Sequence, residues 1–245
     1  MAIELLRILE QVNRHSGERA QNLACGITAG LLEEIHEDMD RNKAPGIDGV
    51  RKEDYSEGVT EKLEDLVSRM KREAYKPQAS RRTYIDKPGS DAKRPLGISC
   101  YEDKLVERAV AQILDIVYEP IFKDLSYGFR VGRNCHQAVK KVIAEVQDHR
   151  VSYVVEADIR SFFDTLNHDM LIRFLEHDIA DKKFIGIIER LLKAGVMEEG
   201  KYRGSEAGTP QGGCASAVLA NVYLHYVLDL WFDTAVQKGK FRGEA

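Results

Sequence analysis

The chain contains 245 residues, of which 43% are hydrophobic and 31% charged. This length allows one large domain or two small ones with a hydrophobic core, and the composition excludes collagen-like, membrane-spanning and fully disordered proteins. Asp and Glu number 40 against 36 Lys and Arg, a net charge of −4 that by itself argues against a nucleic-acid-binding protein. The four cysteines form no Cys-x-x-Cys pair and the N-terminal residues form no secretion signal, so we expect no zinc site, no membrane association and a cytoplasmic location.

Apolar residues recur at helical spacing along most of the chain. Helices are expected at residues 2–13, 31–41, 60–75, 104–118, 135–147, 168–176, 183–193 and 215–232. Strands are expected at 80–86 and 96–100, which form a hairpin, at 153–158, and in a small hairpin within 196–205. Because helices and a few strands are mixed without βαβ alternation, the sequence predicts an α+β fold.

A locally basic segment contrasts with the acidic total. Residues 71–94 contain eight Lys and Arg against three Asp and Glu. Lys87 and Arg94 lie on opposite sides of the hairpin turn, where an amine and a guanidinium could bind one phosphate-like anion. An ordinary solvated charged turn is the alternative.

Two further features indicate a polar site. Asp158 ends the predicted apolar strand at 153–158, where a carboxylate can bind a divalent cation such as Mg²⁺; an exposed strand-end acid is the alternative. Residues 209–213, Thr-Pro-Gln-Gly-Gly, precede a helix. Glycines allow close approach of a ligand, a helix N-terminus favours an anion, and Gln211 offers a donor and an acceptor. A plain loop before a helix is the alternative here.

Five motifs occur in a fixed order along the chain. They are Arg81-Arg-x-Tyr-Ile-x-Lys87, Arg94-Pro-Leu-Gly-Ile98, Ser126-Tyr-Gly-Phe-Arg130, Glu156-Ala-Asp-Ile-x-x-Phe-Phe-Asp164 and Thr209-Pro-Gln-Gly-Gly213. In this order they resemble the reverse transcriptases of bacterial group II introns and their maturase relatives. Residues 42–49 resemble that family's N-terminal extension, and the resemblance covers residues 31–245.

The resemblance implies a right-hand polymerase, here its fingers and an incomplete palm of ferredoxin-like type. The implied domains are an N-terminal extension (1–78), fingers (79–150), a palm strand with the first catalytic aspartate (151–168), a connection between fingers and palm (169–211) and a palm helix (212–245).

The implied activity is RNA-directed DNA polymerisation, a phosphoryl transfer from a dNTP to a primer 3′-hydroxyl assisted by two metal ions, Mg²⁺ or alternatively Mn²⁺. By resemblance, Asp158 and the backbone carbonyl of Ile159 bind the metal. The implied nucleotide-binding residues are Lys87, Arg94, Phe163, Gln211 and Gly212. The residues expected to bind RNA are Arg81, Arg82, Arg130 and Arg133. The implied partners are an RNA template with its primer, dNTP and intron RNA.

The chain departs from the family pattern in two places. No Tyr-x-Asp-Asp motif follows the palm helix, so two of the expected catalytic aspartates are absent from residues 1–245. We therefore expect a fragment that is inactive alone and that self-associates or associates with a C-terminal part. The alternatives are a noncatalytic RNA-binding module or half of a split polymerase. The residues after Gly213 read Cys-Ala-Ser-Ala and lack the family's proline, which puts the details of the nucleotide pocket in doubt.

Overall fold

The computed structural model describes residues 3–14, 17–86, 89, 91, 93–148, 151–209 and 212–240. Its elements are α1 (Ile3–Arg14), η1 (Ala24–Gly26), α2 (Ala29–Asp38), α3 (Lys52–Ser56), α4 (Val59–Lys71), β1 (Ser80–Asp86), β2 (Lys93–Ile98), α5 (Tyr101–Tyr118), α6 (Cys135–Asp148), α7 (Phe162–Thr165), α8 (His168–Asp178), α9 (Lys182–Lys193), β3 (Val196–Glu198), β4 (Lys201–Arg203), α10 (Ser216–Leu224), η2 (His225–Asp229) and η3 (Phe232–Lys240). None of these helices is long and apolar enough to cross a bilayer.

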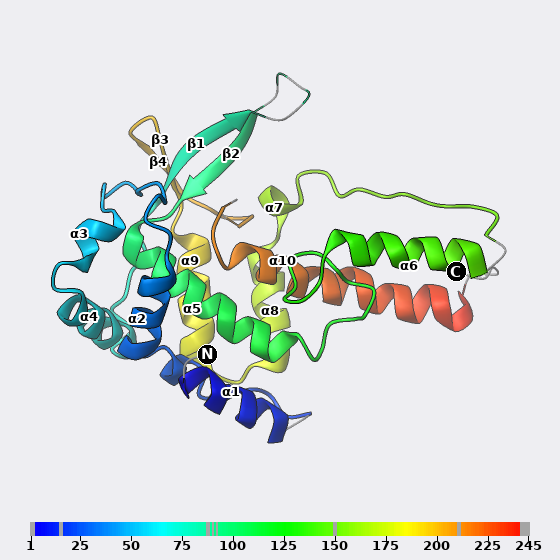
Figure 1. Ribbon diagram of the computed structural model, residues 1–245, viewed down its shortest axis with the longest axis horizontal. Coiled ribbons are helices and arrows are strands. Elements are labelled where there is room, and N and C mark those ends of the chain that lie inside the picture. The colour runs from blue at the N-terminus through cyan, green and yellow to red at the C-terminus, as the bar shows by residue number, and fades with distance from the viewer. Residues whose placement is uncertain are drawn as a thin grey trace.

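Helix α5 forms the centre of the hydrophobic core. Its apolar residues are almost continuous, and five consecutive core positions are fully buried: Leu105, Val106, Ala109, Val110 and Ile113. The helix contacts α1 and α2 on one side and α10 on the other. In Figure 1 it runs through the middle of the molecule, between the N-terminal helices and α8 to α10. A helix buried on most sides in this way fixes the relative position of the elements around it.

The strands form one four-stranded sheet in the order β2-β1-β3-β4. The predicted hairpin is confirmed, because β1 and β2 pair antiparallel from Arg81 opposite Ile98 to Asp86 opposite Lys93. The second hairpin, β3 and β4, is also confirmed. The sequence did not predict that β3 pairs parallel to β1, with Ser80 opposite Val196. The β1–β2 ribbon projects beyond the helical body (Figure 1).

The predicted strand at 153–158 is wrong. Residues 151–159 have no strand or helix in the structure, and Tyr153, Val154 and Val155 are 89%, 77% and 90% exposed. A strand needs a neighbour for its N–H and C=O groups, and none of the described strands pairs with this segment. The apolar, β-branched sequence therefore has the propensity for a strand but no partner among the described residues.

The helix predictions hold for α1, α2, α4, α5, α6, α8 and α9, with shifted ends. Two of these ends follow from side-chain caps. Thr28 accepts a hydrogen bond from the N–H of Leu31, so α2 begins earlier than predicted. Asn167 accepts one from Met170 and begins α8, as the sequence predicts. The predicted helix at 215–232 is confirmed from Ser216 on, but the α-helix α10 ends at Leu224, where the backbone changes to the π-helical turns of η2.

Candidate functional site

The described residues of the predicted 208–213 turn, Gly208, Thr209, Gly212 and Gly213, lie between α7 and strand β2. The Thr209 N–H donates to the carbonyl oxygen of Phe163 at 2.8 Å, and the Gly208 N–H donates to Leu166 at 2.7 Å. On the other side, a Cβ added to Gly212 would be 3.1 Å from the carbonyl oxygen of Gly97 in β2. Three segments that are far apart in sequence therefore meet at this turn.

Two glycines of the turn are required by its geometry. Gly208 and Gly212 have φ angles of +83° and +112°, which other residues adopt only under strain. An added Cβ on Gly208 would also be 2.7 Å from the carbonyl oxygen of Phe163. The sequence suggested that the glycines of residues 209–213 admit a ligand; at Gly212, as at Gly208, the close neighbour is the chain's own backbone.

Phe163 belongs to the short helix α7, which an aromatic contact holds in place. The ring of Phe162 lies 6.0 Å from that of Tyr223 in α10 and 5.8 Å from that of Phe163. Ser161, just before α7, has a left-handed φ of 50° and turns the chain into it. Phe163 is half-buried. Its ring therefore has a fixed support on one side and remains accessible on the other.

Arg94 lies in β2, the strand whose residue Gly97 is close to Gly212 in the turn. Residues two apart on a strand share a face, so Arg94 lies on the face of Leu96, whose side chain would be 3.9 Å from a Cβ on Gly212. Arg94 is exposed. Lys87 and Gln211 lie outside the described residues. The structure thus brings Gly212, Phe163 and the strand of Arg94 into one region.

The predicted metal ligands are not part of these contacts. Asp158 and Ile159 are exposed and lie in the extended segment before α7. Among the described residues, no group of three or more His, Cys, Asp or Glu side chains is arranged to hold a metal ion. Asp158 alone does not fit a two-metal site, which needs carboxylates from convergent elements.

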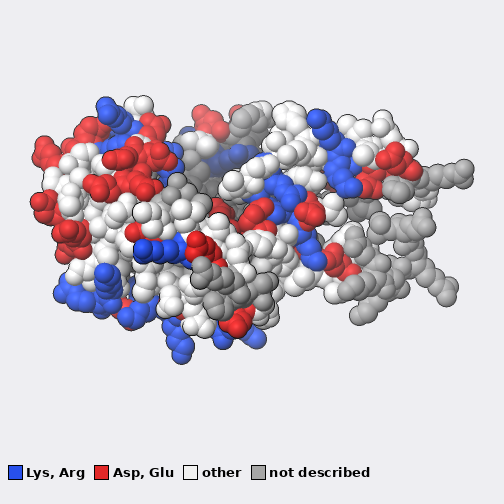
Figure 2. Space-filling view, turned by 60° about the horizontal axis from the view of Figure 1, so that its bottom comes forward, with Lys and Arg blue, Asp and Glu red and all other residues white. Residues whose placement is uncertain are grey.

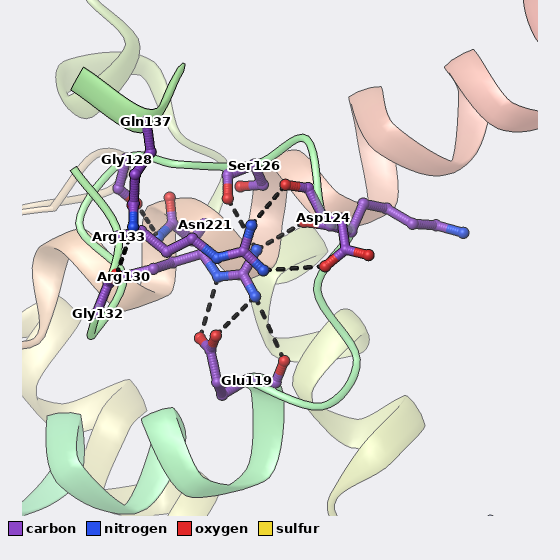
Figure 3. Close-up of polar contacts among 10 residues, drawn as sticks. Glu119, Asp124, Ser126, Gly128, Arg130, Gly132, Arg133, Gln137 and Asn221 are labelled. Atoms are coloured by element: carbon purple, nitrogen blue, oxygen red, sulfur yellow. Dashed lines mark hydrogen bonds and ion pairs between the residues drawn. The ribbon is translucent and has the colours of Figure 1, made fainter. Parts of the chain in front are cut away.

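Arg130 contradicts its predicted role in RNA binding. Its side chain is 2% exposed and donates to both carboxylate oxygens of Glu119, at 3.0 and 2.7 Å, and to the carbonyl oxygens of Lys123 and Ser126. Its guanidinium also lies 5.3 Å from the ring centroid of Phe122. Figure 3 shows the polar contacts of Arg130 at the end of α5. With its donors used inside the fold, this arginine holds the 119–130 loop together.

The other three arginines differ in how accessible they are. Arg133 pairs with Asp124 at 3.0 Å but keeps part of its side chain at the surface (Figure 3). Arg81 donates twice to the carbonyl oxygen of Pro45, at 3.1 and 2.9 Å, and so joins β1 to the 42–49 loop. Arg82 is half-buried on the opposite face of β1. RNA contacts by these three residues stay predictions.

The sequence analysis missed a polar cluster in the first two turns of α5. Asp103 accepts hydrogen bonds from the Tyr75 hydroxyl at 2.6 Å and the Gln78 N–H at 2.9 Å, and burial raises the pKa of this carboxyl to about 7. Lys104 donates to the carbonyl oxygen of Ala44 at 2.6 Å, and burial lowers the pKa of its amine. These contacts attach the N-terminal segments to the base of the β1–β2 ribbon.

Comparison with solved structures shows a reverse transcriptase fold. The partial Cas6-RT-Cas1--Cas2 complex matches with a TM-score of 0.51 at 22% identity, over 86% of this chain and 35% of that chain. The family model described as "Reverse transcriptase (RNA-dependent DNA polymerase)" matches residues 85–239. The chain therefore belongs to the reverse transcriptase family, and its relatives place it among the group II intron reverse transcriptases and maturases.

The curated relatives are longer than this chain. Group II intron-encoded protein LtrA of Lactococcus lactis subsp. cremoris is 37% identical over 226 residues, which are 90% of this chain and 37% of LtrA. Protein YkfC of Escherichia coli is 36% identical over 185 residues, covering 74% of this chain and 48% of YkfC. The chain thus spans less than half the length of these two relatives.

Proposed function

We propose that this chain forms the fingers and part of the palm of an RNA-directed DNA polymerase of the group II intron type. The observation that supports this most strongly is the meeting of the 208–213 turn with Phe163 and with Gly97 of β2. These segments are separated by tens of residues, and the family resemblance assigns all three to one nucleotide pocket. Local sequence does not dictate such a contact, so it is independent support for the pocket.

In this proposal each element contributes one interaction with a dNTP. The guanidinium of Arg94, with Lys87, binds the triphosphate, because a planar fork of donors fits phosphate oxygens. The ring of Phe163 packs under the sugar, and Gly212 lets the turn approach β2 closely, which keeps the turn beside the strand that carries Arg94. Asp158 and the backbone carbonyl of Ile159 would contribute two ligands to a divalent metal, Mg²⁺ or Mn²⁺, and the other carboxylates would have to come from another segment. The chemistry that such a metal would supply is activation of the primer hydroxyl and stabilisation of the leaving pyrophosphate.

We further propose that the chain is inactive alone and needs a second segment with further carboxylates, within a longer protein or as the other part of a split polymerase. The unpaired, exposed segment 151–159 supports this, as does α6, where no residue is buried. Four apolar residues spaced three or four apart on α6 are 47–58% exposed: Val139, Val142, Ile143 and Val146. A further sheet of the palm would cover such surfaces.

Template and intron RNA are proposed to contact the β1–β2 ribbon and the surface near Arg133. Figure 2 shows acidic side chains gathered over the end of the molecule formed by α3 and α4. The exposed acids there are Glu53, Asp54, Glu57, Glu61, Glu64 and Asp65. Phosphates are repelled from that end, which favours RNA binding elsewhere. Because such binding depends on contacts of Lys and Arg with phosphate, it should weaken steeply with salt. The four free cysteines fit a cytoplasmic location.

The test is primer extension on an RNA template with dNTPs and Mg²⁺. We expect no extension by the chain alone. We expect extension by a chimera that joins the chain to the part of LtrA that follows the matched region. Asp158→Asn should abolish extension by the chimera. Asp164→Asn is the control, since Asp164 is an exposed acid six residues further on, in α7, and it should retain activity.

Three outcomes would contradict parts of this proposal. Robust extension by the chain alone would refute its inactivity. Equal activity of the chimera with and without Asp158→Asn would refute the metal-ligand assignment. A chimera that binds RNA with strong salt dependence but never extends a primer would favour the noncatalytic RNA-binding module instead.

A further inference from the structure

A single buried carboxylate joins the 208–213 turn to the fingers. Glu107 lies in the second turn of α5 and is 7% exposed. One of its oxygens accepts a hydrogen bond from the Ser99 hydroxyl at 2.6 Å, and the other accepts from the N–H of Cys214 at 2.8 Å. Ser99 directly follows β2, and Cys214 directly follows the Gly212–Gly213 pair. The carboxylate therefore connects the end of the strand that contains Arg94 to the end of the glycine turn.

The surroundings of Glu107 are unusual for an acid. Burial raises the pKa of its carboxyl, while the hydrogen bonds from Ser99 and Cys214 and the charge of Lys104 act in the opposite direction. A buried charge is costly unless its hydrogen-bonding capacity is used, and here both oxygens have donors. Apolar residues line the same side of α5, among them Val110. Apolar packing therefore does not explain an acid at this position, whereas the two hydrogen bonds do.

A shift of the 208–213 turn would change its distance from strand β2. An added Cβ on Gly212 would already be 3.1 Å from the carbonyl oxygen of Gly97, so the turn and β2 are in close contact. The amide that Glu107 holds is only two residues beyond Gly212. Releasing it would let the turn move away from the strand while α7 and β2 stay in place.

We propose that Glu107 is a positioning residue for the nucleotide pocket: its carboxylate sets the distance between the Gly212–Gly213 turn and strand β2. The effect on a nucleotide pocket rests on the proposed polymerase function. The link between the turn and the strand rests only on the two hydrogen bonds of Glu107. Glu107 touches no reacting atom in this account. It acts through the Cys214 amide on the turn, and through Ser99 on the strand.

The chemistry of the two donors predicts which substitutions are tolerated. In Glu107→Gln, the amide oxygen can accept from the Cys214 N–H, and the amide N–H can donate to the Ser99 oxygen after the hydroxyl rotates. In Glu107→Ala both donors lose their partner. Glu107→Asp keeps the charge but is one methylene shorter, and it replaces the alanine variant if that protein does not fold.

The first measurement is amide hydrogen exchange of the chain labelled with isotopic cysteine, whose four amide signals report Cys25, Cys100, Cys135 and Cys214. In Glu107→Ala the Cys214 amide should exchange at least about tenfold faster, the factor expected for one lost buried hydrogen bond. Glu107→Gln should remain within about threefold of the wild-type rate, as should Ser99→Ala, which removes only the strand-side donor. Leu32→Ala, a buried residue of α2, controls for general destabilisation.

The second measurement is steady-state kinetics of the primer-extending chimera. Glu107→Ala should raise KM for dNTP more than it lowers kcat, and Glu107→Gln should restore KM. An unchanged Cys214 exchange rate in Glu107→Ala, or an equal increase in Leu32→Ala, overturns the inference whether or not any polymerase activity exists. An unchanged KM in an active chimera overturns the positioning role. An inactive chimera contradicts only the proposed function, because the exchange rates decide the hydrogen-bond tie independently.

Discussion

Gly46 is the position where one added methyl group should most clearly disturb the scaffold of the site. It belongs to the 42–49 loop, and a Cβ there would lie 2.6 Å from Cα and 2.7 Å from the backbone nitrogen of Cys100. Contacts between such atoms are normally at least about 3.4 Å, so the loop must move by roughly 0.8 Å in Gly46→Ala. Both opposing atoms are backbone, which cannot rotate away as a side chain could.

The loss of stability in Gly46→Ala can be estimated from the contacts that the 42–49 loop makes. Overpacking of this kind costs about 1–3 kcal/mol, and the shift also strains the hydrogen bonds from Arg81 to Pro45 and from Lys104 to Ala44. We expect Gly46→Ala to lower the free energy of unfolding by about 2–4 kcal/mol in urea denaturation followed by circular dichroism.

Gly128→Ala is the matched control for Gly46→Ala. A Cβ at Gly128 meets no atom within 4 Å, and its φ is not in the left-handed region. It should leave stability unchanged or raise it by up to about 1 kcal/mol. If the two variants unfold at the same urea concentration, the close contact between Gly46 and Cys100 is not present in solution.

Two other stability measurements test the interior contacts. Because the pKa of Asp103 is raised to about 7, its contribution to stability is complete below the ordinary pKa of an aspartate and is lost as the pH rises through about 7. The free energy of unfolding should fall between about pH 4 and pH 7, by up to roughly 4 kcal/mol, and Asp103→Asn should flatten this slope. Arg130→Lys should cost about 3 kcal/mol, whereas Arg133→Lys, nearer the surface, should cost less than about 1 kcal/mol in the same urea assay; equal costs would contradict the buried role of Arg130.

The structural features that the sequence predicted best are those determined by residues close together in the chain. The β1–β2 hairpin follows from a turn-rich segment between two strand-like runs, and the start of α8 follows from a cap at Asn167. The glycine turn was predicted as a tight loop before a helix, which α10 confirms. The parallel pairing of β1 with β3 was not predictable, because nothing local specifies which distant strand completes a sheet.

Arg130 and Glu107 show why the role of a charge depends on tertiary contacts. The loop around Arg130 is basic and aromatic, which is also the pattern of an RNA-binding loop. Its actual partner, Glu119, is eleven residues earlier and is recognisable only once the loop folds back on α5. Glu107 offered a clearer signal. It shares a helical face with Asp103 and the apolar residues Val110 and Leu114, and an acid within such a face indicates a buried hydrogen-bonding role.

The proposed missing part of the palm would explain the failure of the strand prediction at 153–158 together with two other features of the structure. The α6 helix has an exposed apolar stripe, and Val227, Leu228 and Trp231 of the last helical segment are 48%, 43% and 50% exposed. Figure 1 places α6, the extended segment and η3 at the end of the molecule opposite α3 and α4. The segment 151–159, α6 and residues 227–231 each expose apolar side chains that the described residues leave partly uncovered. One additional layer of sheet would pair the segment 151–159 and cover both helical faces, so a single interaction accounts for all three departures from expected burial.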